Sequence, residues 1–164
     1  MKKVAVIMGS DSDLPIVEKG INVLKEYGVP HEVHVYSAHR TPMECAEFVS
    51  KAEDNGFGVI IAAAGMAAHL AGAVAANTVL PVIGIPVSSK HIGGMDALLS
   101  TVQMPTGIPV ATVAIDGAAN AAILAVQILA LSDTELKNKL VSARAESKKT
   151  VLSKNSAIEE KYNN

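Results

Sequence analysis

The chain has 164 residues, of which 49% are hydrophobic and 18% are charged. This balance excludes an intrinsically disordered chain, which needs low hydrophobicity and high net charge, and it suffices for one buried core. The formal net charge of −2 provides no basic excess to hold a nucleic-acid backbone, so we expect no nucleic-acid partner. Cys45 is the only cysteine, which excludes an intramolecular disulfide and favours the reducing cytoplasm.

The first part of the chain alternates short apolar runs with helical patterns. Lys3–Met8 is an unbroken apolar run, typical of a strand buried on both faces of a parallel sheet. Gly9–Asp13 then offers capping residues, and apolar residues follow at helical spacing as far as Leu24. His31–Tyr36 alternates polar and apolar residues, which predicts a strand near an edge of the sheet. A second helix is predicted from about Pro42 to Asn55.

The rest of the chain continues the same alternation. Its expected elements are, in chain order, a strand at Gly58–Ala62, a turn at Ala63–Ala67, a helix through about Asn77, a strand at Leu80–Ile85, a helix near Gly94–Val102, a strand at Pro109–Ile115, a helix at Ala118–Leu131, a last helix from about Asp133 to about Ser153, and a polar tail at 154–164. Five strand–helix repeats imply right-handed crossovers. We therefore expect a single domain over residues 1–164 of the α/β class, a three-layer α/β/α sandwich with a mainly parallel, flavodoxin-like sheet.

One stretch is tested as a membrane span. Val59–Ala76 carries no formal charge and reaches the lower limit of spanning length. It consists mostly of alanine and glycine, which insert weakly, and it contains His69. A buried strand, a glycine turn and a buried helix explain it better, so we expect no membrane partner.

Three unusual turns follow the first three predicted strands. They are Gly9–Asp13, Ser37–Pro42 and Ala63–His69. In open α/β sheets, ligands bind beyond the carboxyl ends of the strands, where the strand order reverses. All three turns are therefore predicted to meet at one edge of the sheet and to form a binding site there.

The first two turns carry the polar chemistry. Ser10 and Asp13 open a helix, whose free N–H groups suit a phosphate, while an aspartate suits sugar hydroxyls; the alternative is a simple helix cap. Ser37, His39 and Arg40 combine a hydroxyl, an imidazole that titrates near neutral pH and a guanidinium suited to phosphate. In the alternative reading, Arg40 forms a surface ion pair and His39 caps the helix.

The third turn offers space rather than chemistry. Small residues such as Ala64 and Gly65 make room for a flat ligand. His69 is either a ligand contact or a buried histidine bonded to a carbonyl. After the fourth strand, Lys90 and His91 come near the same edge and are candidates for the mouth of the site, with a purely structural role as the alternative. The spacing of Cys and His residues provides no zinc site.

The segments GSDSD, SAHRTP, AAAGMAAHL, IPV and QMPTGIPVATVAI closely resemble the N5-carboxyaminoimidazole ribonucleotide mutase family of purine biosynthesis, also described as class I phosphoribosylaminoimidazole carboxylase catalytic subunits. The similarity runs in order from about Lys3 to Leu131. The AAHL segment resembles the mutase branch, because the related carboxylase branch, which uses carbon dioxide directly, usually has an Arg- and Ser-containing loop there.

This resemblance implies an isomerase that moves a carboxyl group from the exocyclic nitrogen of an aminoimidazole ribonucleotide to ring carbon C4. It implies a homo-octamer and neither metal nor any other cofactor. His39 would be the general acid/base. The expected substrate-binding residues are Ser10, Asp13, Ser37 and Arg40 around the ribose phosphate, and Ala64, Gly65, His69 and Leu70 around the ring and the mobile carboxyl group.

The chain also departs from the commonest family pattern. Met66 stands where many relatives have glycine, Ala71 where many have proline, and the turn 115–118 is about two residues short. These changes concern pocket shape and subunit contacts rather than the proton carrier. Two alternative functions remain open at this point: a direct carboxylase on the same fold, and a nucleotide-binding module without catalysis.

Overall fold

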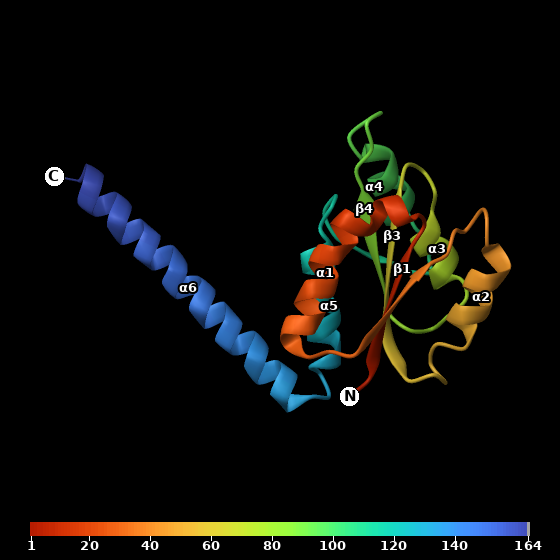
Figure 1. Ribbon diagram of the computed structural model, residues 1–164, viewed down its shortest axis with the longest axis horizontal. Coiled ribbons are helices and arrows are strands. Elements are labelled where there is room, and N and C mark those ends of the chain that lie inside the picture. Colours follow the sequence, from red (N-terminus) through yellow and green to blue (C-terminus); the bar gives the residue numbers. More distant parts are fainter. Residues whose placement is uncertain (164) are drawn as a thin grey trace.

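A five-stranded sheet forms the centre of the structure, a computed structural model that describes residues 1–163 (Figure 1). The strands are β1 (Lys3–Met8), β2 (His31–Val35), β3 (Phe57–Gly65), β4 (Val82–Val87) and β5 (Ala111–Thr112). Their order is β2-β1-β3-β4-β5, and every neighbouring pair is parallel. This is the flavodoxin-like order, which confirms the predicted fold class. The order reverses between β1 and β3.

Helices cover both faces of the sheet. They are α1 (Leu14–Tyr27), α2 (Pro42–Ser50), α3 (Leu70–Ala75), α4 (Met95–Val102), α5 (Ala118–Leu129) and α6 (Thr134–Tyr162), with a 3-10 turn at Asp11–Asp13 before α1. Figure 1 shows α1 and α5 on one side of the sheet and α2 and α3 on the other. Each face of the sheet has its own hydrophobic core, and successive side chains of β1 point into them alternately. Val4 and Val6 pack with α1 and α5, whereas Ala5 and Ile7 pack with α2 and α3.

Small residues allow one helix pair to approach closely. The inner face of α5 presents the fully buried Ala118, Ala121, Ala122 and Ala125. A Cβ atom placed on Gly20 of α1 would lie 2.7 Å from the carbonyl oxygen of Ala118. Glycine at this position therefore lets the backbones of α1 and α5 pack against each other, which draws both helices close to the sheet.

Several predicted boundaries were wrong. β3 runs through Gly65, so Ala63 and Ala64 lie in the strand and not in a turn. β5 is limited to Ala111–Thr112, because it pairs with β4 only and lies at an edge. α2 ends at Ser50 rather than near Asn55.

The last helix also differs from its expected length. α6 continues past Ser153 to Tyr162, since this segment contains neither glycine nor proline to end it. Most of the segment expected as a polar tail is therefore helical, while Asn164 lies outside the described residues. Figure 1 shows α6 extending away from the sheet and its covering helices.

The uncharged stretch 59–76 forms most of β3 and all of α3, as expected of a buried strand and helix. Both elements are buried in the core, for example at Ile60 and Val74. Within residues 1–163, none of the helices combines the length and the apolar character that crossing a membrane requires.

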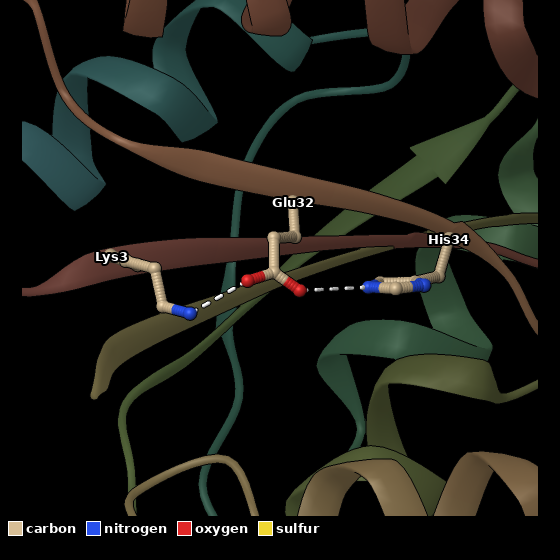
Figure 2. A network of polar contacts seen from close by, with 3 residues as sticks. All are labelled: Lys3, Glu32 and His34. Carbon is tan, nitrogen blue, oxygen red and sulfur yellow. Dashed lines mark hydrogen bonds and ion pairs between the residues drawn. The ribbon is translucent and has the colours of Figure 1, made fainter. Parts of the chain in front are cut away.

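The edge strand β2 and its neighbour β1 share a polar network of Lys3, Glu32 and His34 (Figure 2). The Lys3 ammonium lies 2.6 Å from Oε1 of Glu32, and Nε2 of His34 lies 3.6 Å from Oε2 of the same carboxylate. The hydrogen bond from Lys3 lowers the pKa of Glu32. The His34 ring packs against both Tyr36 and Phe48, which gives His34 a structural role at the sheet edge.

Candidate active site

A cavity of about 600 Å³ opens at the carboxyl ends of the strands. Segments that follow four different strands line it, on both sides of the position where the strand order reverses. The lining residues are Gly9, Ser10, Ser12, Asp13, Ser37, Ala38, His39, Arg40, Ala64, Gly65, Met66, Ala68, Leu70, Val87, Ser88, Ser89, Lys90 and His91. The predicted convergence of three turns at one edge is therefore confirmed.

The turn after β1 is held by a capping box. The Ser10 hydroxyl accepts a hydrogen bond from the Ser12 N–H at 3.3 Å, and the Asp13 carboxylate accepts one from the Ser10 N–H at 3.2 Å. These bonds fix the 3-10 turn that leads into α1 beside the cavity. Asp13 is only 8% exposed, and burial raises the pKa of its carboxyl; the bond from Ser10 lowers this pKa and the charge of Asp11 raises it.

The turn after β2 presents the imidazole and the guanidinium. The Ser37 hydroxyl accepts hydrogen bonds from the backbone N–H groups of His39 and Arg40, at 3.3 and 3.2 Å. Both of these side chains are exposed to the cavity. Nη2 of Arg40 also donates to the carbonyl oxygen of Gly9 at 2.9 Å, which ties the second turn to the first.

The end of β3 provides a smooth wall of small residues. Ala64 and Gly65, together with Leu70 at the start of α3, line the cavity without offering a charged or hydroxyl group. A Cβ atom on Gly65 would lie 3.4 Å from the carbonyl oxygen of Val87 on the neighbouring strand. This wall is suited to a flat, planar ligand.

His69 lies apart from the other candidates and does not line the cavity. Its Nδ1 donates to the carbonyl oxygen of Ser100 at 2.6 Å, and its ring occupies the position where a side chain on Gly72 would be. The bond to a carbonyl agrees with the alternative interpretation, but His69 is exposed rather than buried as that interpretation expected. In this position His69 ties the turn before α3 to α4.

Several lining residues were not singled out as site residues in the sequence. Met66, in the left-handed conformation at φ 53°, and Val87 carry no polar group that would have marked them. Ser12, Ser88 and Ser89 carry hydroxyls, but serine is common in turns and its presence alone marks no site. Lys90 and His91 do line the cavity, in agreement with their position after the fourth strand. Within residues 1–163, no three His, Cys, Asp or Glu side chains gather in a group that could hold a metal ion.

Comparison with known families identifies the chain. Residues 3–150 match the AIR carboxylase family. The chain belongs to the AIR carboxylase family. A relative from Pyrococcus horikoshii, named N5-carboxyaminoimidazole ribonucleotide mutase, is 54% identical over 157 residues, which cover 96% of this chain and 89% of the relative. A relative of the same name from Thermotoga maritima is 48% identical and covers 98% of this chain and 94% of its own length.

Solved structures of AIR carboxylase family proteins agree with the fold. The crystal structure of Treponema denticola PurE superposes with a TM-score of 0.86 at 29% sequence identity, covering 94% of this chain and 96% of that protein. The match extends over nearly the whole of both chains, so the cavity lies in a family fold rather than in an added segment.

Proposed function

We propose that this chain is an N5-carboxyaminoimidazole ribonucleotide mutase, an isomerase of purine biosynthesis. It converts its substrate into 4-carboxy-5-aminoimidazole ribonucleotide. The observation that carries the proposal is the gathering of His39, Arg40 and Ser10 opposite the small residues Ala64 and Gly65 in one cavity. Curated relatives that are 54% and 48% identical in sequence carry the name of this mutase and support the same activity.

The substrate has three parts, and the cavity offers a partner for each. Arg40 presents a planar fork of donors to the ribose phosphate, beside the hydroxyls of Ser10 and Ser37. The Asp13 carboxylate accepts hydrogen bonds from the ribose hydroxyls. The aminoimidazole ring lies against the small residues at the end of β3 and against Leu70, and His69, exposed in the turn before α3, helps to shape this wall.

The reaction needs one group that both gives and takes a proton, and we assign this role to His39. Its imidazolium donates a proton to the carbamate nitrogen, so the bond from that nitrogen to the carboxyl carbon breaks and carbon dioxide is released. C4 of the electron-rich ring then attacks the carbon dioxide and forms the new carbon–carbon bond. The neutral His39 finally removes the proton from C4, which restores both the aromatic ring and the imidazolium.

Retention of carbon dioxide depends on the walls of the cavity. A free molecule of carbon dioxide would leave faster than it reacts unless C4 is held next to it. Orienting the two reactants turns a bimolecular step into a unimolecular one, which contributes up to about 7–11 kcal/mol. Alanine and glycine at the end of β3 let the ring lie close against the backbone, and this close fit favours recapture at C4.

Asp13→Asn separates stability from binding. The pKa of the Asp13 carboxyl is higher in the folded protein than in the unfolded chain. This carboxyl therefore stabilises the fold fully at pH values below its unfolded pKa, and the stabilisation is lost as the pH rises through its folded pKa. Asparagine removes this loss, so we expect a urea midpoint at pH 7 equal to or above that of the unmodified protein. Ribonucleotide affinity should fall by roughly 10-fold, because the amide leaves one acceptor oxygen. Asp11→Asn is the exposed control, and equal weakening by both variants would contradict the role of Asp13.

A labelled substrate tests the activity directly. N5-carboxyaminoimidazole ribonucleotide with an isotopic label in its carboxyl group is generated in situ, without added metal and after ATP has been removed, and is offered in unlabelled bicarbonate buffer. We expect most of the label in the C4-carboxylated product, because the carbon dioxide is recaptured before it can exchange.

Two other results would overturn the mutase assignment in different ways. Loss of the label, together with turnover of aminoimidazole ribonucleotide and bicarbonate, would indicate a direct carboxylase. Absence of turnover by either route, with ribonucleotide binding intact, would indicate a binding module without catalysis.

We further propose that the protein works as a homo-octamer in the cytoplasm. α6 supports assembly, since only Leu136 of its residues is buried and apolar side chains such as Val151 and Ile158 are exposed along it. A long helix outside a core gains little stability without a packing partner. The single, buried, free thiol of Cys45 fits a reducing compartment. A solution mass near eight times 17.0 kDa is the expected result in light scattering.

A further inference from the structure

The segment between β4 and α4 forms one wall of the cavity and carries a second cation. Ser88, Ser89, Lys90 and His91 all line the cavity. Arg40 and Lys90 are the one arginine and the one lysine among the lining residues, and Asp13 is the one lining residue with a carboxylate. The proposed mechanism uses Arg40 and Asp13 but leaves Lys90 without a role.

Arg40 and Lys90 belong to opposite walls. Arg40 follows β2 and Lys90 follows β4, and β1 and β3 lie between these two strands. The Arg40 guanidinium reaches Gly9 after β1, and two strand spacings, or about 10 Å at the usual distance between strands, separate β1 from β4. The cavity therefore suits a ligand with anionic groups at both ends.

The two ends of the loop that carries Lys90 meet at its base. A Cβ atom on Gly94 would lie 3.1 Å from Cα of Ser88 and 2.9 Å from Cγ2 of Ile115. Gly93 and Gly94 both have left-handed backbones, at φ 63° and 91°, which lets the chain turn back sharply. Ser88 and Gly94 are thus held together beside the turn that begins at Ile115.

Asp116 closes this base. Its N–H donates to the carbonyl oxygen of Pro86 at 2.9 Å. Its carboxylate accepts two bonds from Ser88, one from the backbone N–H at 2.8 Å and one from the hydroxyl at 2.7 Å. Asp116 has a φ of 58°, a conformation that costs most residues energy and that aspartate tolerates better than most. Both carboxylate oxygens are therefore committed to holding Ser88.

We propose that Lys90 binds the carboxylate of the substrate and that Asp116 is the positioning residue that holds Lys90 at the cavity. The proposal rests on the proposed function, in which the substrate carries a phosphate at one end and a carboxyl group at the other. Arg40 and Lys90 divide these two anions between opposite walls. Lysine suits the carboxyl group, because a mobile point charge can follow it from the nitrogen to C4.

The test compares two ligands on four proteins: the unmodified chain, Lys90→Ala, Asp116→Gly and the double variant. The ligands are the product 4-carboxy-5-aminoimidazole ribonucleotide and aminoimidazole ribonucleotide, which lacks the carboxyl group. Lys90→Ala should weaken product binding by about 10-fold or more and leave aminoimidazole ribonucleotide within about 2-fold, since only the product offers the charge-assisted bond. Lys51→Ala is the matched control, because Lys51 is an exposed lysine directly after α2 and does not line the cavity.

Asp116→Gly keeps the left-handed backbone but removes the carboxylate. It should reproduce the product-selective loss, and Asp116→Asn, which keeps an acceptor for the Ser88 N–H, should restore most of the affinity. The double variant should bind the product no more weakly than Lys90→Ala alone, because both changes remove one interaction. Ser88→Ala, which keeps the backbone bond to Asp116, should give a smaller loss.

Three results would overturn the proposal. Unchanged product affinity in Lys90→Ala would remove Lys90 from binding. Equal weakening of both ligands by Asp116→Gly, or losses that multiply in the double variant, would make Asp116 a structural residue only. Failure of the proposed function is distinguishable, since it shows as an absence of turnover in the unmodified protein, whereas these binding comparisons need no turnover.

Discussion

Replacing His39 by asparagine should abolish turnover while the protein still binds its ribonucleotide. Asparagine keeps a polar side chain of similar size but cannot carry a proton between nitrogen and C4. A positioned acid/base typically contributes about 10²–10⁴-fold, and we expect at least this loss in kcat. In the proposed complex Arg40 and Ser37 still hold the ribose phosphate, so the dissociation constant of the product should change by no more than about 3-fold. Single-turnover rates and product titrations measure the two effects separately.

His31→Asn is the matched control for this variant. His31 lies on β2 outside the cavity and donates from Nδ1 to the carbonyl oxygen of Val29 at 2.9 Å, so its loss should leave kcat unchanged. Added imidazole should restore part of the activity of His39→Asn, since His39 is exposed to solvent and its place is open. Turnover of His39→Asn at the rate of the unmodified protein would remove His39 from the mechanism.

The arrangement of the sheet was predictable because its signals are local. Alternation in His31–Tyr36 predicted an edge strand, and β2 lies at the edge. Boundaries were less predictable where residue types are neutral. Ala63, Ala64 and Gly65 lack the β-branched side chains that mark strands, yet they continue β3, because β4 offers them a pairing partner as far as Val87.

The site followed from chain topology more than from individual residues. Gly9–Asp13 and Ser37–Pro42 come after neighbouring parallel strands, so their meeting at one edge follows from the fold class. The bonds between Ser88 and Asp116 could not be predicted, since 28 residues separate them and neither residue stands in a recognisable motif. The position of His69 could not be predicted either. The segment that contains it does line the cavity, but His69 itself donates to the carbonyl oxygen of Ser100 on α4 and is not among the lining residues.

Arg40→Ala should remove the preference of the protein for phosphorylated ligands. In the proposed complex, the guanidinium donates two bonds to the phosphate, and hydrogen bonds to charged groups contribute about 1.5–3 kcal/mol each. We therefore expect the dissociation constant of 4-carboxy-5-aminoimidazole ribonucleotide to rise by at least about 100-fold. The corresponding nucleoside, which lacks the phosphate, should bind Arg40→Ala and the unmodified protein about equally weakly. Calorimetric titration of both ligands into both proteins measures this coupling.

Arg40→Lys separates charge from geometry. Arg40 also donates to the carbonyl oxygen of Gly9, so alanine both removes a charge and frees the turn after β2 from the turn after β1. Lysine keeps the charge but not the planar fork, and it should recover only part of the affinity. Nucleoside binding reports whether the two turns still form the site. If alanine weakened nucleoside and ribonucleotide equally, Arg40 would act by holding the turns together, and the phosphate would have to bind elsewhere, at the hydroxyls of Ser10 and Ser12.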